Sequence, residues 1–229
     1  MIKIVKKITM ITTMTAVILT STITPVTSTI ASSPQTVLAA SGYSGKIYKH
    51  WCRMRTSKSK KARTIKKLKV GTKVTVLSTS GSWRKIKVGG KTGYVLKKYV
   101  YISTNAPKLK GRTYTKGKTV ASFAQRFVGN PYVWGGTNLN TGADCSGFVK
   151  SVYKAFGYNL PRSSSSQRSA GRKVAYSKKQ PGDLICYNGH VAIYIGNGKI
   201  VHASSKKTGI KISPKANYRK VLSVRRIVK

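Results

Sequence analysis

Acidic residues are almost absent from this chain of 229 residues, which has two Asp, no Glu and 45 Lys or Arg, for a formal net charge of +43 at pH 7. This scarcity excludes sites that need several carboxylates, such as EF-hands, carboxylate-rich metal centres and the two-carboxylate site of glycosidases. The hydrophobic fraction of 40% is still sufficient for a buried core. A chain this basic is suited to polyanions, namely nucleic acid, an anionic membrane or the phosphate-bearing polymers of a bacterial wall.

A long, uninterrupted hydrophobic run is also missing. The most apolar stretch, residues 8–23, contains several threonines and is followed by Pro25, so it falls short of the roughly 20 strongly apolar residues that a membrane span prefers. Three lysines precede it within residues 1–7, and Val37–Ala39 offers small residues for cleavage, with Thr29–Ala31 as a second candidate. We therefore predict a signal peptide over residues 1–39, and a secreted, wall-associated protein without a stable membrane span.

Cysteine is scarce as well, with Cys52, Cys145 and Cys186 the only three. An odd number in an exported protein leaves at least one thiol unpaired within the monomer, which indicates either a reactive or a buried cysteine. Nothing in the sequence favours a disulfide between Cys52 and Cys186.

Residues 43–101 have the pattern of short strands separated by turns, with Ser80–Ser82 and Gly89-Gly90 as hairpin loops. The segments Gly71–Leu77, Ser82–Val88 and Gly90–Val95 resemble a bacterial SH3-like domain, a small all-β barrel often attached to wall enzymes. The resemblance implies that Cys52 replaces a buried aliphatic residue. Trp83 is interpreted as a packed barrel aromatic, with a platform for ligand stacking as the alternative.

Residues 102–117 lack periodicity and are predicted to be a linker. A second domain, residues 118–229, begins with two helical patterns, one around Val120–Val128 and one around Phe148–Phe156. Strand-like runs follow these helices, at residues 184–187, 190–195, 199–203 and 221–228. Helices followed by strands predict an α+β fold.

Cys145 lies where the second of these helices starts. The dipole of a helix N-terminus and a neighbouring imidazolium both lower the pKa of a thiol and so favour its reactive thiolate. His190 begins one predicted strand and His202 lies in the next, across Gly196–Gly198. A cysteine at a helix start with two candidate bases points to nucleophilic catalysis, in which His190 is the base and His202 orients it.

The register of this hairpin decides whether the two histidines share a face. A two-residue Asn197-Gly198 turn would place His202 opposite Ile193, on the other face from His190. A three-residue loop would place His202 opposite Ala192, as a diagonal neighbour of His190. We therefore predict the three-residue loop.

The second domain resembles the NlpC-type cysteine peptidases over roughly residues 116–229. Six blocks in the family order carry this resemblance: Pro131–Gly136, Asp144–Val149, Leu160–Arg162, Pro181–Leu184, Gly189–Gly196 and Val201–Ala203. It implies a papain-like α+β fold, a triad of Cys145, His190 and His202, and no metal or organic cofactor. It also implies hydrolysis of peptidoglycan stem peptides, typically between the γ-carboxyl of D-Glu and the diamino acid.

The resemblance extends to two further residues in the site. Tyr132 matches a family tyrosine near the nucleophile, where its hydroxyl would help to hold the oxyanion; the alternative is an aromatic that lines the cleft. Asp144 is expected to face away from the sulfur, either as the N-cap of the catalytic helix or as the acceptor of a substrate's terminal amine. Asp183 is interpreted as a turn residue, and Cys186 as part of the core.

Three function classes follow. The leading one is an endopeptidase of peptidoglycan whose basic surface is retained by anionic wall polymers, with an amidase that cuts the muramoyl–L-Ala bond as the alternative enzyme. The second is a non-catalytic wall-binding protein. The third, a nucleic-acid binder, rests on charge alone, because no specific nucleic-acid motif accompanies it.

Overall fold

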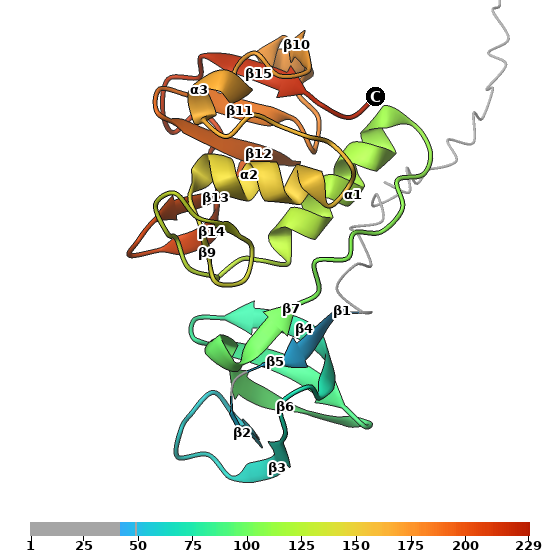
Figure 1. The fold of residues 1–229 in the computed structure, drawn as a ribbon, viewed down its shortest axis with the longest axis vertical. Coiled ribbons are helices and arrows are strands. Elements are labelled where there is room, and N and C mark those ends of the chain that lie inside the picture. Colours follow the sequence, from blue (N-terminus) through green and yellow to red (C-terminus); the bar gives the residue numbers. More distant parts are fainter. Residues whose placement is uncertain (1–41, 49) are drawn as a thin grey trace, which may run out of the picture. The chain divides into compact units, whose positions relative to one another are not determined.

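The computed structural model describes residues 42–48 and 50–229, so the predicted signal peptide, residues 1–39, lies outside the described residues. The described chain contains an all-β region followed by a region of helices and strands (Figure 1), which confirms the predicted fold class. Within these residues, no helix is both long and apolar enough to cross a membrane.

The all-β region is a seven-stranded antiparallel sheet in the order β3-β2-β6-β5-β4-β1-β7. Along β4 the buried residues Val74 and Val76 alternate with more exposed ones, as expected for strands with one side toward a core. Gly89 and Gly90 connect β5 to β6 with φ values of 52° and 78°, the backbone that a two-residue hairpin turn requires. The strands are β1 Tyr43–Ile47, β2 Cys52–Arg55, β3 Thr64–Leu68, β4 Lys73–Ser80, β5 Trp83–Val88, β6 Lys91–Leu96 and β7 Val100–Ile102, with the 3-10 helix η1 Lys97–Tyr99 before β7.

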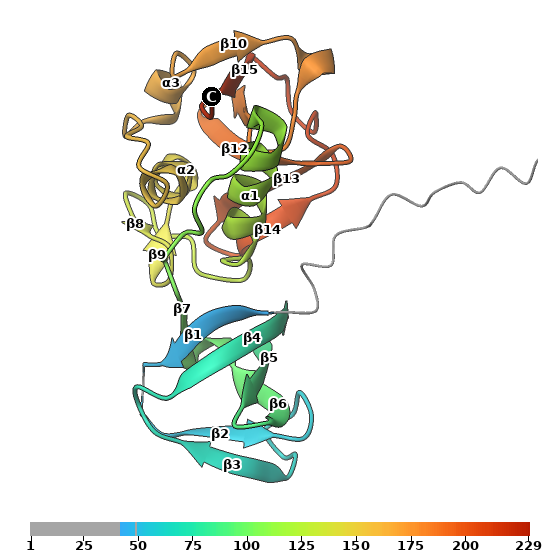
Figure 2. The same cartoon turned by 90° about the vertical axis from the view of Figure 1, so that its right-hand side faces the viewer.

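The second region is built on a six-stranded antiparallel sheet in the order β10-β15-β11-β12-β13-β14, and helices α1 and α2 lie against it (Figures 1 and 2). Val191 and Ile193 of β12 belong to the same apolar cluster as Phe123 and Phe148 of the helices. The intervening Ala192 and the other side of the sheet belong to a second cluster. The elements are α1 Thr113–Gln125, β8 Thr137–Asn138, β9 Gly142–Ala143, α2 Cys145–Lys154, α3 Ser164–Gln167, β10 Arg172–Val174, η2 Tyr176–Lys178, β11 Leu184–Tyr187, β12 His190–Gly196, β13 Lys199–Ser205, β14 Gly209–Ser213 and β15 Ser223–Arg226.

The first helix starts earlier than the sequence indicates. Helix α1 begins at Thr113, inside the segment 102–117 that was predicted to be a linker, so the irregular connection ends at Arg112. The reason is that the first turn of α1 contributes no buried apolar side chain, since Tyr114 and Thr115 are exposed and Thr113 and Lys116 are part-buried polar residues. Four short strands of this region, namely β8, β9, β10 and β14, and the short helix α3 were not predicted.

Candidate active site

Cys145 is the first residue of α2, and its side chain is 8% exposed. Gly147 allows this helix start to approach the preceding loop, because a Cβ at position 147 would collide with the carbonyl oxygen of Gly136. Asp144 N donates to the same oxygen at 3.1 Å. The glycine after Ser146 therefore lets the loop and the helix meet at the candidate nucleophile.

Two opposing influences act on the Cys145 thiol. Burial raises its pKa, and the nearby Asp144 carboxylate raises it further. Backbone N–H groups of Val191, Ser146 and Cys145 itself lower the pKa, but the net shift is upward. The resting sulfur is therefore a thiol that needs a base, and the Val191 N–H places it beside the start of β12.

The hairpin of β12 and β13 brings the two histidines together, but its loop length and its strand register differ from those predicted. Gly196 pairs with Lys199, so the loop is the two-residue turn Asn197-Gly198 and the predicted three-residue loop is wrong. A β-bulge between Tyr194 and Gly196 then shifts the register, and Ile193 pairs with Val201. Continued by one residue, this register sets His202 opposite Ala192 and on the same face as His190.

A hydrogen-bonded chain runs through the two histidines to Ser213 at the end of β14. His190 Nε2 lies 2.7 Å from His202 Nδ1, and His202 Nε2 lies 2.9 Å from Ser213 Oγ. A neutral imidazole carries one N–H. If His202 donates to Ser213, its Nδ1 accepts from His190 Nε2–H, and the remaining His190 nitrogen, Nδ1, is free to accept a proton. The sequence analysis missed Ser213, because β14 itself was not predicted.

Both imidazoles are held in the neutral form. Burial, with a contribution from the positive charge of Arg219, lowers the pKa of His190 to about 4. For His202, burial and the charges of His190, Lys211 and Arg219 lower the pKa to about 3. Neutral imidazole beside a neutral thiol is the starting state for general-base catalysis at neutral pH.

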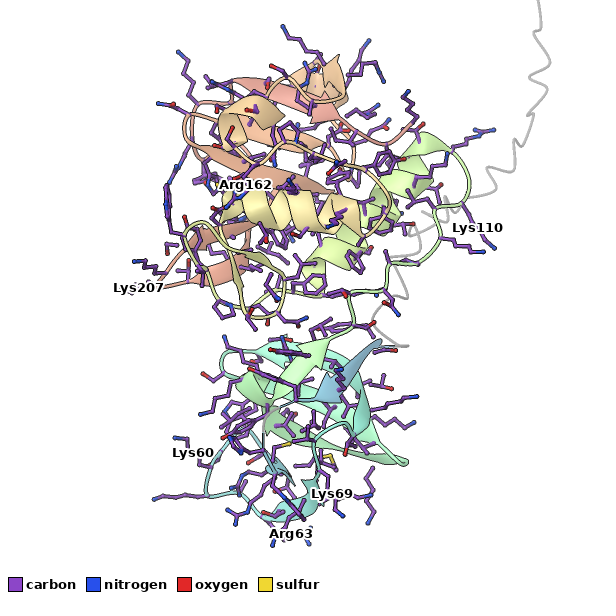
Figure 3. All side chains as sticks on the ribbon, in the orientation of Figure 1. Lys60, Arg63, Lys69, Lys110, Arg162 and Lys207 are labelled. Atoms are coloured by element: carbon purple, nitrogen blue, oxygen red, sulfur yellow. The ribbon has the colours of Figure 1, made fainter. Side chains whose placement is uncertain are left out.

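Asp144 is the N-cap of α2, which confirms one of its two predicted roles. Its Oδ1 accepts from Gly147 N at 2.7 Å, and its two oxygens accept from the Arg162 guanidinium at 3.0 and 2.6 Å. Gly135 N and Ser146 Oγ donate to it as well. Figure 3 shows Arg162 beside α2. The other expectation, an acceptor for a substrate amine, would require this carboxylate to exchange one of these partners.

Tyr132 lies on the loop before α2, in an isolated bridge with Ala143. Burial and the negative charges that Cys145 and Asp144 carry when ionised raise the pKa of its hydroxyl, so the hydroxyl stays protonated and can donate. The loop is fixed two residues earlier by Asn130, whose Oδ1 accepts from the fully buried Arg84 at 2.6 Å and whose Nδ2 donates to Leu139 O at 2.8 Å.

The remaining sequence predictions concern residues outside the reacting groups. Cys52 and Cys186 are free and buried. Asp183 accepts from Gln180 N at 2.7 Å, which confirms its role in a turn, and it also pairs with Arg226 at 2.7 Å, which was not predicted. The described residues contain no group of three His, Cys, Asp or Glu side chains that could hold a metal ion.

Comparison with known protein families agrees with this division of the chain. Residues 129–226 match the model of the NlpC/P60 family, and residues 52–101 match the model of the bacterial SH3 domain.

Individual relatives match part of the chain. A bifunctional muramidase/DL-endopeptidase, CwlT, of Bacillus subtilis is 38% identical over 104 residues, which are 42% of this chain and 31% of CwlT. A γ-D-glutamyl-L-lysine dipeptidyl-peptidase of the same organism is 42% identical over 91 residues, 36% of this chain and 30% of that enzyme. The crystal structure of the NlpC/p60 domain of the peptidoglycan hydrolase SagA is 32% identical, with a TM-score of 0.43, and the match covers 48% of this chain and 97% of that domain. The chain thus spans about a third of the length of the two curated relatives.

Proposed function

Because the chain carries an NlpC/P60 domain at residues 129–226 and a bacterial SH3 domain at residues 52–101, we propose that it is a secreted cysteine endopeptidase of peptidoglycan. The observation that carries the proposal is the free Cys145 at the start of α2, next to the hydrogen-bonded chain of His190, His202 and Ser213. The proposed organisation is a signal peptide at 1–39, a wall-binding domain at 43–101 and a peptidase domain whose predicted start at residue 118 moves to Thr113, where α1 begins.

In the proposed reaction, His190 Nδ1 takes the thiol proton of Cys145 as the sulfur attacks the carbonyl carbon of the scissile amide. The tetrahedral intermediate collapses to a thioester, and His190 gives the proton to the departing amine. Water then attacks the thioester, His190 takes a proton from it, and the thiol and a free carboxyl group are released. His202 fixes the tautomer of His190 throughout.

The hydroxyl of Tyr132 is proposed to donate to the oxyanion of the tetrahedral intermediate. This hydroxyl is protonated, and it is close enough to Cys145 that a charge on the sulfur raises its pKa. The N–H groups around the sulfur are further candidates, since Val191 N and Cys145 N both act on Cys145. Asp144 and Arg162 are proposed to stabilise the substrate site where α2 begins.

The proposed bond is the one between the γ-carboxyl of D-Glu and the diamino acid. The names of two similar enzymes, a DL-endopeptidase and a γ-D-glutamyl-L-lysine dipeptidyl-peptidase, support a bond of this type. Digestion of purified sacculi, with mass spectrometry of the new termini, tests it. New D-Glu γ-carboxyl and diamino acid amine termini are expected, whereas a free muramic lactyl carboxyl would identify the alternative, an amidase.

The non-catalytic alternative is tested with Cys145→Ala. We expect this variant to bind walls as the parent does and to release no soluble muropeptides. Unchanged wall lysis by Cys145→Ala would refute the role of Cys145.

A further inference from the structure

A groove of about 710 Å³ opens on the all-β region, away from the cysteine site in sequence. Three aromatic side chains line it, namely Trp51, Trp83 and Tyr99. Trp51 is 64% exposed, an unusual position for the residue type with the largest apolar surface, and Lys69 Nζ lies 5.8 Å from the centre of its ring. The groove therefore offers a flat, accessible aromatic face.

Cations surround these rings. The groove is also lined by Arg53, Arg55, Lys60, Lys67 and Lys98. Figure 3 shows Lys60 and Arg63 in the connection between β2 and β3, and Lys69 directly after β3. One of the cations is held in place, since Arg55 Nη1 donates to Ala62 O at 2.7 Å.

No carboxylate side chain neutralises this cluster. The whole sequence has two acidic residues, and the structure pairs Asp144 with Arg162 and Asp183 with Arg226, both outside the groove. Five lining cations without an acidic neighbour repel one another, so a bound polyanion would relieve that repulsion. Guanidinium groups in addition hold phosphate oxygens in a bidentate manner.

We propose that the groove binds a sugar-bearing polymer with phosphodiester linkages, in which phosphates meet the cations and a sugar ring stacks on Trp51. This inference rests on the proposed function, because it assumes a protein located at the wall. A stem peptide carries too few negative charges for five cations. Single-stranded nucleic acid uses the same combination of aromatic rings and cations, but the NlpC/P60 domain on the same chain favours a wall polymer.

The test measures binding of soluble poly(ribitol phosphate), with and without N-acetylglucosamine substituents, to the full chain by calorimetry. Trp51→Ala should weaken binding of the substituted polymer about ten-fold, the loss of one stacking platform, and binding of the bare polymer much less. Lys67→Gln should weaken binding of both polymers and lower the salt dependence.

Matched controls distinguish binding in the groove from non-specific attraction to the basic surface. Tyr114→Ala removes another exposed aromatic that has a lysine over its ring, with Lys118 Nζ at 5.5 Å. Lys66→Gln removes the same charge from the neighbouring position of β3, which does not line the groove. Both controls should change affinity less than about two-fold. Equal losses for Lys66→Gln and Lys67→Gln, or for Tyr114→Ala and Trp51→Ala, would overturn the proposal.

Two other ligands are included as competing outcomes. Tighter binding of a single-stranded oligonucleotide, or of a purified stem peptide, with the same loss in Trp51→Ala, would assign the groove to that ligand instead. Lysis of sacculi stripped of phosphate polymers is measured in parallel. A failure of the parent protein to lyse them would refute the proposed function, while a failure of polymer binding alone would refute only the groove.

Discussion

His190 Nε2 and His202 Nδ1 are 2.7 Å apart, so a single hydrogen atom serves both nitrogens. The two rings meet edge to face, with an interplanar angle of 80°. In the proposed mechanism, the second imidazole would orient the first, which is the role that a carboxylate has in a serine-protease triad.

Ser213 Oγ lies 2.9 Å from His202 Nε2, and by accepting from an Nε2–H it would hold His202 in the tautomer that the proposed mechanism requires. Ser213→Ala should lower kcat about five-fold with little change in KM, because one hydrogen bond worth about 1 kcal/mol is lost. Ser213→Thr, which retains a hydroxyl, should recover most of that rate. Ser205→Ala, on the same hairpin, is the control, and kinetics on a defined muropeptide would contradict this role if Ser213→Ala and Ser205→Ala behaved alike.

On the acid side of the pH profile, kcat/KM should be half of its maximum near pH 4. His190 is active as the neutral base, and burial together with Arg219 lowers its pKa to about 4, so kcat/KM should fall only as the pH drops through that value. Arg219→Gln should move this midpoint to higher pH, and Lys220→Gln should not. A midpoint near the ordinary histidine pKa in the parent would show that the resting imidazole is not neutral.

The lowered pKa values of the two histidines also make the free energy of unfolding depend on pH. Because the folded pKa values of His190 and His202 lie below the unfolded value of about 6.5, their contribution to folding is complete above about pH 6.5 and is lost as the pH falls through about 4 to 3.

Arg162 neutralises Asp144 next to the nucleophile. In Arg162→Gln the carboxylate is left without its guanidinium partner and raises the thiol pKa further, so kcat/KM should fall, by about ten-fold. Adding Asp144→Asn removes that charge but keeps an oxygen that can cap α2, and the double variant should be more active than Arg162→Gln. No recovery in the double variant would mean that Arg162 acts by geometry and not by charge.

The proposed role of the Tyr132 hydroxyl as an oxyanion donor can be tested by removing its oxygen atom. Tyr132→Phe should lower kcat about 100-fold if the hydroxyl donates to the oxyanion, with KM nearly unchanged. Tyr158→Phe is the control. If Tyr132→Phe alters KM and leaves kcat as it was, the ring only lines the substrate site.

The domain types were predicted from the sequence, and so was the set of Cys145, His190 and His202 that the structure gathers at the candidate site, because both depend on local patterns. Asp144 before an apolar helix, for example, is an N-cap signal that needs no tertiary information. The hairpin shows the limit of such reasoning. Asn197 and Gly198 make the two-residue turn, and the compensating bulge next to Gly196, with φ of 96°, has no sequence pattern that specifies its register.

Long-range pairs were not predictable for a similar reason. Arg162 reaches Asp144 across 18 residues, and Ser213 reaches His202 from a strand of five residues. In a chain with 45 basic residues, the identity of the one arginine that meets a given carboxylate depends on packing, which local patterns do not encode. Of the groove residues, Trp83 was considered as a stacking platform from the sequence, whereas the lining cations were seen only as part of a general excess of charge.

The near absence of acids also makes the surface charge insensitive to protons. Apart from three histidines, the chain has no side chains with an ordinary pKa between about 5 and 8, since lysine and arginine lose their protons only above about pH 10. Phosphodiesters stay charged over the same range. Attachment of this protein to a polyanion should therefore respond to ionic strength and hardly at all to acidification, so that salt, and not pH, sets how long it stays bound.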